Sequence, residues 1–347
     1  MMEERMENKK SLAGSAVLLR SLVKKSDFGT VVAGIGLFLI FSLATDSFFT
    51  AYNLFNVGRN VAIDVFIALG QAAVMIVGGM NLSVGAIGGL ATVTAGFVMQ
   101  NLGLPGWVAI LAAIAVGIFT GWLNGLIITR TKLNSFIVTL ATSFIFTGLV
   151  YGISHGYPYT KIPDSFTLIG QGRVAGIPYL VVLMVMTLAI LHYVFRYTVT
   201  GRRLLATGGN TQAARLSGIE TDHMITLANM LSGFFAAVAA LCWLSRMGSA
   251  QPATGQDWMI ISFAVAVIGG TGLSGGSISP VGLFFGGLIM VLIKNGLILL
   301  QVDVYYEQTF LGIIILIAVM FGQFQGMFPQ KHARKLGTVK PGDGKGK

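Results

Sequence analysis

Charged residues are scarce in this sequence. Asp, Glu, Lys and Arg together make up 10% of its 347 residues, whereas soluble domains usually carry about 25%. Hydrophobic residues make up 54%, and the mean hydropathy is +0.78. One large soluble core does not account for so much apolar surface, so the composition excludes an ordinary soluble protein and indicates many membrane spans.

Cysteine and histidine are also nearly absent. The single cysteine, Cys242, excludes an internal disulfide framework and a cysteine-rich metal site. The four histidines show no H-x-x-H or H-E-x-x-H spacing, and no G-x-x-x-x-G-K-[ST] segment is present. We therefore expect no covalent chemistry and no cofactor on this chain. An ATP-driven step would need a partner ATPase that holds ATP and magnesium.

Ten apolar runs are candidate membrane spans. They lie at 28–44, 61–79, 82–100, 107–129, 135–153, 178–195, 223–245, 258–272, 280–300 and 308–326. A full crossing takes about 20 residues, and the eighth run is short. Paired glycines at 78–79, 269–270 and 275–276 can break helices within the membrane, where the backbone must then face protein or a water-filled path. The prediction is an all-α polytopic membrane protein with about ten transmembrane helices.

Basic residues set the predicted orientation. They cluster in the segment 1–27 and in the tail 327–347, so we place both termini in the cytoplasm. The cytoplasmic segments then hold eighteen of the 23 Lys and Arg residues and the external segments hold four, as positive-inside sorting predicts. No A-x-A cleavage site follows the run 28–44, so we expect a retained first span and one transmembrane domain over 28–326.

A polar insert at 196–222 interrupts the apolar runs on the predicted cytoplasmic side. Asn210 or Thr211 can cap a short helix there, and Gly218 can end it. A helix of about two turns is unstable alone in water, so it must dock. It packs either on its own bundle or, as we predict, in a cleft of a cytoplasmic partner whose motion it transmits.

Several uncharged polar residues lie inside the predicted spans or at their ends. An unpaired polar group is costly in hydrocarbon, so these side chains must face protein or water. They either line a path for a hydroxylated solute or bridge helices through hydrogen bonds worth about 1 kcal/mol or less each. The path candidates are Gln71, Asn81, Ser83, Asn124 and Asn295, with Asn229 as a further polar position.

The sequence contains a weak internal echo. The segments 78-GGMNLSVG-85 and 269-GGTGLSGG-276 share G-G-x-x-L-S-x-G, and 124-NGLII-128 resembles 295-NGLIL-299. The two offsets differ by about one span, so a repeat would have lost or gained one element. Repeated bundles are common in transporters. Chance similarity in a Gly- and Leu-rich chain is the alternative.

Four stretches together resemble the permease subunits of bacterial ABC importers for ribose and related sugars, a family that includes the autoinducer-2 permeases. They are 78-GGMNLSVGA-86, 208-GGNTQAARLSGI-219, 246-RMGSAQPATGQDWMI-260 and 265-VAVIGGTGLSGGSISPVGLFFGGLIMVLIKNGLILL-300. The resemblance covers roughly residues 28–326, and the combination is specific. Two departures leave the exact sugar open: Asn81 replaces the usual Asp, and Gln256-Asp257-Trp258 replaces a more acidic run.

The resemblance implies two permeases and two ATPases in the bacterial inner membrane, fed by a periplasmic or lipid-anchored solute-binding protein. The second permease would be identical or similar. In such importers a cytoplasmic helix with an A-A-x-x-x-G pattern engages the ATPase. That pattern falls on Ala213, Ala214 and Gly218, with Asn210, Arg215 and Ser217 around the contact. The implied solute is a ribose-like monosaccharide, with autoinducer-2 or a nucleoside as alternatives.

Two rival classes make different demands on the residues. An ion-coupled secondary carrier would work without an ATPase, and proton relays use acidic or histidine side chains inside spans. No carboxylate lies securely in the middle of a predicted span, Asp64 being the closest. A membrane-embedded enzyme would need ionisable or metal-binding residues clustered at one depth, and the sequence shows no such cluster.

Overall fold

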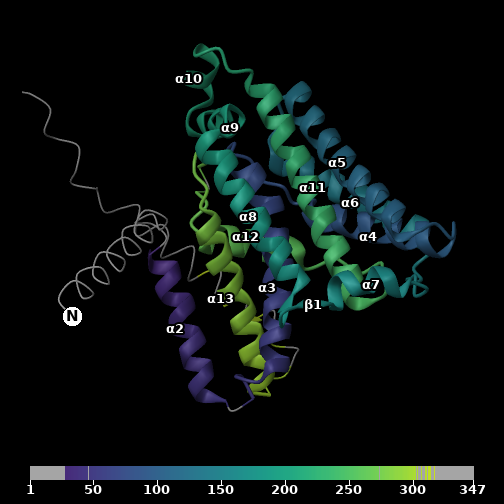
Figure 1. The fold of residues 1–347 in the computed structure, drawn as a ribbon. Helices are drawn as coiled ribbons and strands as arrows, with labels where there is room; N and C mark the ends of the chain where they lie inside the picture. Colours follow the sequence, from purple (N-terminus) through teal and green to yellow (C-terminus); the bar gives the residue numbers. More distant parts are fainter. Residues whose placement is uncertain are drawn as a thin grey trace, which may run out of the picture.

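The protein is almost wholly helical (Figure 1). The computed structural model describes residues 28–45, 47–272 and 274–301, and the single residues 303, 306, 309, 310, 312, 313 and 316. Helices form in the first nine predicted spans: α2 (Phe28–Ala44), α3 (Ala51–Met75), α4 (Val84–Gln100), α5 (Gly106–Thr131), α6 (Ser135–Ser154), α8 (Tyr179–Tyr197), α11 (Thr221–Met247), α12 (Trp258–Ile268) and α13 (Pro280–Leu299). The segment 1–27, most of the tenth predicted span and the tail 327–347 lie outside the described residues.

The apolar helices fall into two length classes. Among the described residues, six helices are long and apolar enough to cross a membrane: α3, α5, α6, α8, α11 and α13. The helices α2, α4 and α12 are shorter, and α12 has 11 residues. At a rise of 1.5 Å per residue, α12 is roughly 16 Å long, about half of a 30 Å hydrocarbon core. It therefore does not cross a membrane by itself, in keeping with the shortness of the predicted run 258–272.

Glycines with left-handed backbone conformations mark two helix breaks. One break is the turn between α3 and α4, where Gly78 has φ +79°. The other lies between α12 and α13, where Gly270, Gly275 and Gly276 have φ of +75°, +84° and +74°. L-residues with side chains rarely adopt these values, whereas glycine does so at little cost. The structure thus confirms the predicted breaks at the paired glycines.

Helix α3 forms the centre of the bundle, and α5, α6 and α8 lie at its periphery. Every residue from 61 to 77 is buried, and α3 packs against α8, α11, α12 and α13. The peripheral helices instead turn large apolar side chains outward, such as Leu111, Phe144 and Met186. Apolar faces of this extent mark a surface that meets lipid or another protein.

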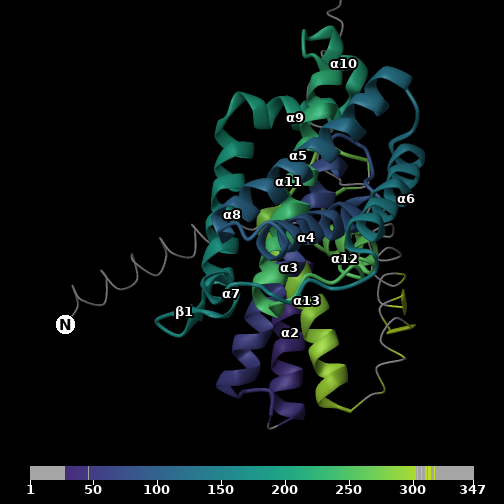
Figure 2. The same ribbon diagram turned by 90° about the vertical axis from the view of Figure 1, so that its right-hand side faces the viewer.

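Small elements connect the long helices. The helix α7 (Asp164–Gln171) precedes an antiparallel hairpin of β1 (Arg173–Val174) and β2 (Ile177–Pro178), in which Val174 pairs with Ile177. Two helices, α9 (Val199–Gly209) and α10 (Thr211–Leu216), follow α8. Figures 1 and 2 place α9 and α10 at one end of the bundle, away from α7 and the hairpin. The sequence did not predict α7, the hairpin or α9, because each is too short to show a clear apolar period.

Candidate functional site

The short helix α10 forms where the sequence predicts it. The Asn210 side chain is the N-cap, and its Oδ1 accepts a hydrogen bond from the Ala213 backbone N–H at 2.9 Å. At the other end, the Ser217 hydroxyl donates to the Ala213 carbonyl at 2.9 Å. Gly218, with φ +81°, reverses the chain, and the Ile219 N–H then donates to the Ala214 carbonyl. Local capping chemistry thus defines both ends of α10.

The two faces of α10 differ sharply in exposure. Ala214 is buried against the rest of the chain, whereas Leu216 is 91% exposed. Two residues apart on a helix of 3.6 residues per turn point to nearly opposite sides. The five other predicted coupling residues are exposed: Asn210, Ala213, Arg215, Ser217 and Gly218. Sequence reasoning missed Leu216, although an isolated leucine between Arg215 and Ser217 in a polar segment is a signal that could have identified it.

An ion-pair cluster holds α10 beside α11 and the α5–α6 connection. Asp222, in the first turn of α11, accepts from Lys132 Nζ at 2.6 Å and from Arg215 Nη2 at 3.3 Å. Arg215 also donates to the Thr221 hydroxyl at 3.1 Å. These charged side chains are about half exposed, so each pair contributes at most about 1 kcal/mol. The cluster therefore positions these segments more than it stabilises the fold, because it connects three segments at this end of the bundle.

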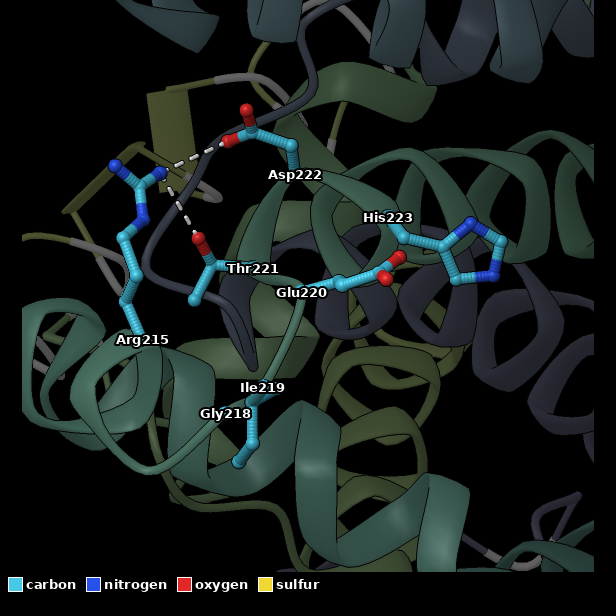
Figure 3. A pocket seen from close by; sticks show the side chains of 7 residues that line it. All are labelled: Arg215, Gly218, Ile219, Glu220, Thr221, Asp222 and His223. Atoms are coloured by element: carbon cyan, nitrogen blue, oxygen red, sulfur yellow. Dashed lines mark hydrogen bonds and ion pairs between the residues drawn. The ribbon is translucent and has the colours of Figure 1, made fainter.

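A surface pocket of about 540 Å³ lies next to this cluster (Figure 3). Arg215 and Asp222 lie at one side of it, and Glu220 and His223 at the other. Its lining residues are Arg215, Gly218, Ile219, Glu220, Thr221, Asp222 and His223. The pocket therefore presents basic and acidic side chains around the apolar Ile219. Such a surface can accept a side chain of a partner protein and pair with its charges.

A second polar cluster is wholly buried, at the helix break between α3 and α4. Asn81 Nδ2 donates to the Ser232 hydroxyl on α11 at 2.8 Å. Asn81 Oδ1 accepts from the Ser83 backbone N–H at 2.9 Å and from the Ser83 hydroxyl at 2.6 Å. Asn124 on α5 donates to the same Ser83 hydroxyl at 2.8 Å. The structure thus brings three of the predicted path residues into one network between α4, α5 and α11.

The other predicted path residues lie apart from this network. Gln71 is buried on α3, and its Oε1 has no hydrogen-bond partner. Within the network, Asn124 Oδ1 is likewise buried without a partner. Asn295 is half-buried on α13 and exchanges side-chain hydrogen bonds with Asn53 at the start of α3, at 2.7 and 3.2 Å. Asn229 donates to the Ile225 carbonyl within α11.

Six long apolar helices, buried amides inside the bundle and apolar outer faces define the class of the protein. It is a multi-pass helical membrane protein. Within the described part of the chain, no three His, Cys, Asp or Glu side chains lie together in a way that could hold a metal ion.

The comparisons with known proteins identify the family. Residues 53–319 match the family model described as branched-chain amino acid transport system / permease component. The ribose import permease protein RbsC of Bacillus subtilis is 38% identical over 312 residues, which are 87% of this chain and 96% of that protein. The corresponding ribose permease of Haemophilus influenzae is 33% identical, over 88% of this chain and 95% of its own length. The D-allose transport system permease protein AlsC of Escherichia coli is 33% identical, over 80% and 85%. The chain belongs to this family of transport permeases, and the predicted resemblance is confirmed.

Proposed function

We propose that this chain is the permease subunit of an ATP-driven importer of a small polar solute, a monosaccharide such as ribose. The observation that carries the proposal is the family membership combined with the names of relatives that match over most of their length, which are import permeases for ribose and D-allose. The family description names branched-chain amino acids, but these longer and more specific matches favour a sugar. An extracytoplasmic solute-binding protein would deliver it.

The energy source would lie in a partner. The sequence contains no P-loop, so ATP and magnesium would be bound by separate ATPase subunits. Two ATPases would engage two permeases, the second being identical or similar to this chain. The exposed face of α10, with Leu216 at its tip and the charged pocket beside it, supports this docking surface. ATP binding and hydrolysis there would move the permease pair between inward-open and outward-open states.

The end of the bundle that carries α9 and α10 would face the cytoplasm. Basic residues concentrate at this end, in the last turn of α5, the α5–α6 connection, the end of α8, and α9 and α10: Arg130, Lys132, Arg196, Arg202, Arg203 and Arg215. This distribution supports the positive-inside orientation. It is consistent with about ten spans over 28–326, a coupling segment at 196–222, and cytoplasmic segments at 1–27 and 327–347 in a bacterial inner membrane.

The translocation path would run beside the helix break at the start of α4. A break in a membrane helix is tolerated where its backbone is buried in protein or lines a water-filled cavity, and the buried network of Asn81, Ser83 and Asn124 lies at this break. We propose that these amides and hydroxyls, with Gln71 and Asn295, border the path when the transporter changes state.

Reconstitution tests the function directly. The chain, its co-purifying ATPase and the binding protein are placed in liposomes, and uptake of labelled ribose is measured with and without ATP. We expect uptake with the full set and ATP, and none from the permease alone. Competition by D-allose, autoinducer-2 and ribonucleosides then identifies the solute class. Full-rate uptake without the ATPase, driven by an ion gradient, would instead make the protein a secondary carrier, and chemical conversion of the solute would make it an enzyme.

Substitution of the exposed leucine tests the docking surface. Leu216→Asp should weaken ATPase binding by at least about tenfold, because burying a leucine at an interface contributes roughly 1.5–3 kcal/mol. Leu168→Asp on α7 is the matched control, since Leu168 is also an exposed leucine, at 62%, but lies away from α10. Co-purification of the ATPase with each variant is the measurement. Equal ATPase recovery with both variants would contradict the assignment of α10.

A further inference from the structure

Three segments distant in the sequence meet backbone to backbone beside α9. They are the turn after α3 at Ile76–Gly78, the last turn of α9 at Gly208, and the pair Gly275-Gly276 before α13. The Gly276 N–H donates to the Ile76 carbonyl at 2.9 Å. A Cβ atom added to Gly208 would lie 1.7 Å from the Ile76 carbonyl oxygen and 2.7 Å from the Gly276 nitrogen. We call these five residues, Ile76, Gly78, Gly208, Gly275 and Gly276, the glycine junction.

The glycine junction joins both halves of the internal sequence echo. Gly78 opens 78-GGMNLSVG-85, and Gly275 and Gly276 close 269-GGTGLSGG-276. A Cβ atom on Gly275 would lie 2.8 Å from the Gly78 nitrogen and 2.9 Å from the Gly208 carbonyl oxygen. Each of the two helix breaks therefore touches the other, and both touch α9.

The turn that starts at this junction leads into the buried polar network. Within that turn, the Met80 N–H donates to the Ser135 hydroxyl at 3.0 Å, and the Leu82 N–H donates to the Thr139 hydroxyl at 3.0 Å. Asn81 lies between them and is bonded to Ser232 and Ser83. A displacement of the turn would therefore move the groups that bridge α4, α6 and α11.

The other side of the junction leads to α10. Asn210 alone separates α9 from α10, and the Thr211 hydroxyl donates to the Thr207 carbonyl at 2.9 Å, which ties the two helices together. Helix α9 therefore carries Gly208 on the junction and α10 at its end. Where two backbones touch, no side chain lies between them that could change rotamer and take up a shift of α9. Because the interior is close-packed, a shift of one backbone therefore displaces the other.

We propose that the glycine junction is the coupling joint of this permease. Movement of α10 would reach the turn 76–83 and the start of α13 through Gly208, and so change the buried polar network at the break between α3 and α4. Gly208 is then a positioning residue for transport. This inference rests on the proposed function, since it assigns to α9 and α10 the motion supplied by an ATPase.

A pair of adjacent alanine substitutions tests the joint. Gly208→Ala places a methyl group into the contact, whereas Gly209→Ala is the matched control because nothing lies within 4 Å of a Cβ atom there. Both variants are reconstituted with the ATPase and the binding protein, and the sugar transported per ATP hydrolysed is measured. For Gly208→Ala we expect retained ATPase binding and hydrolysis, with the ratio reduced by at least about fivefold, within the usual range of coupling between sites. Gly209→Ala should match the wild type.

The outcomes separate this inference from the proposed function. If the wild-type complex shows no ATP-dependent uptake, the proposed function fails. If the wild type transports and Gly208→Ala keeps its transport ratio, or loses hydrolysis and uptake in parallel, the joint is refuted and Gly208 has a structural role at most.

If Gly208→Ala does not fold, hydrogen exchange of the wild-type complex tests whether the glycine junction couples α10 to the turn 76–83. Protection is compared with and without a non-hydrolysable ATP analogue. The proposal expects peptides covering 76–83 to change together with those covering 205–216. A change restricted to 205–216 would overturn it.

Discussion

Asn81 shows how a single buried amide connects three parts of the bundle. Its side chain uses one donor and one acceptor group to reach Ser232 and Ser83, and no part of it is exposed. A buried polar group that loses its partner costs about 1–3 kcal/mol. The identity of this residue therefore affects both the stability of the helix break and the groups placed beside the proposed path.

Two substitutions at Asn81 separate shape from hydrogen bonding. Asn81→Leu leaves the Ser83 N–H and the Ser232 hydroxyl without their partner, so we expect destabilisation of about 1–3 kcal/mol and impaired uptake with ATPase binding retained. Asn81→Asp should keep uptake near the wild-type rate, because carboxylate oxygens accept from Ser83 and from the Ser232 hydroxyl. Melting temperature in detergent and uptake per ATPase-bound complex are the measurements. Wild-type uptake by the leucine variant would show that the network is dispensable for transport.

Leu216 and Ala214 show why a motif does not assign roles to individual side chains. Both lie in α10, but one is 91% exposed and the other is buried. The predicted coupling set included Ala214 and omitted Leu216, because a family pattern records positions without their orientation. Exposure indicates that Leu216 is available to a partner, while Ala214 fixes α10 to its own chain.

Helices α5 and α11 pack in close backbone contact. Gly117, Gly121 and Gly125 lie four residues apart on α5 and face α11. A Cβ atom on Gly121 would lie 2.2 Å from the Asn229 carbonyl oxygen. Small residues at this spacing let membrane helices approach closely and gain packing without a hydrophobic driving force. The contact also holds Asn124 and Ser232 at the distance that the buried network needs.

The α5–α11 contact can be tested with one methyl group. Gly121→Ala should lower the melting temperature in detergent, because its Cβ atom overlaps the α11 backbone and the two helices must separate. Gly152→Ala on α6 is the control, since nothing lies within 4 Å of its Cβ position. Replacing a free helical glycine should be neutral or stabilising by up to about 1 kcal/mol. Equal melting temperatures for the two variants would show that α11 accommodates the added methyl group without a loss of stability.

The whole molecule combines six long apolar helices with three shorter ones in its described part. Helix α12 is too short to cross alone, and it meets α13 at a glycine break. In hydrocarbon, the free backbone groups of such a break must be satisfied by protein. The two breaks satisfy part of this demand for each other through the Gly276–Ile76 hydrogen bond.

Labelling of introduced cysteines tests the orientation of the molecule. Cys242 is the only cysteine and is buried, so Cys242→Ala provides a background without a reactive thiol. Ser217→Cys and Lys340→Cys should react with a membrane-impermeant maleimide in inverted vesicles, and Gly176→Cys should react in spheroplasts. Labelling of Ser217→Cys and Lys340→Cys from opposite sides would overturn the predicted number of spans.

Much of this architecture was readable from local properties of the chain. Apolar runs predicted the positions of nine helices, and cap residues predicted α10 between Asn210 and Gly218. Paired glycines predicted the breaks, and the quoted motifs predicted the family. These features depend on neighbouring residues alone, because helix capping, backbone freedom and the cost of polar groups in hydrocarbon act locally.

Contacts between residues distant in the sequence could not be predicted from these local properties. The network joins Asn81 to Ser232 across 151 positions, and the glycine junction joins Ile76, Gly208 and Gly276. Neither follows from periodicity, because the packing of helices determines which buried groups meet and which backbones touch. The length of α12 and the outward direction of Leu216 likewise depend on packing. Local chemistry determines what kind of segments this protein has, and the folded arrangement determines which of them touch.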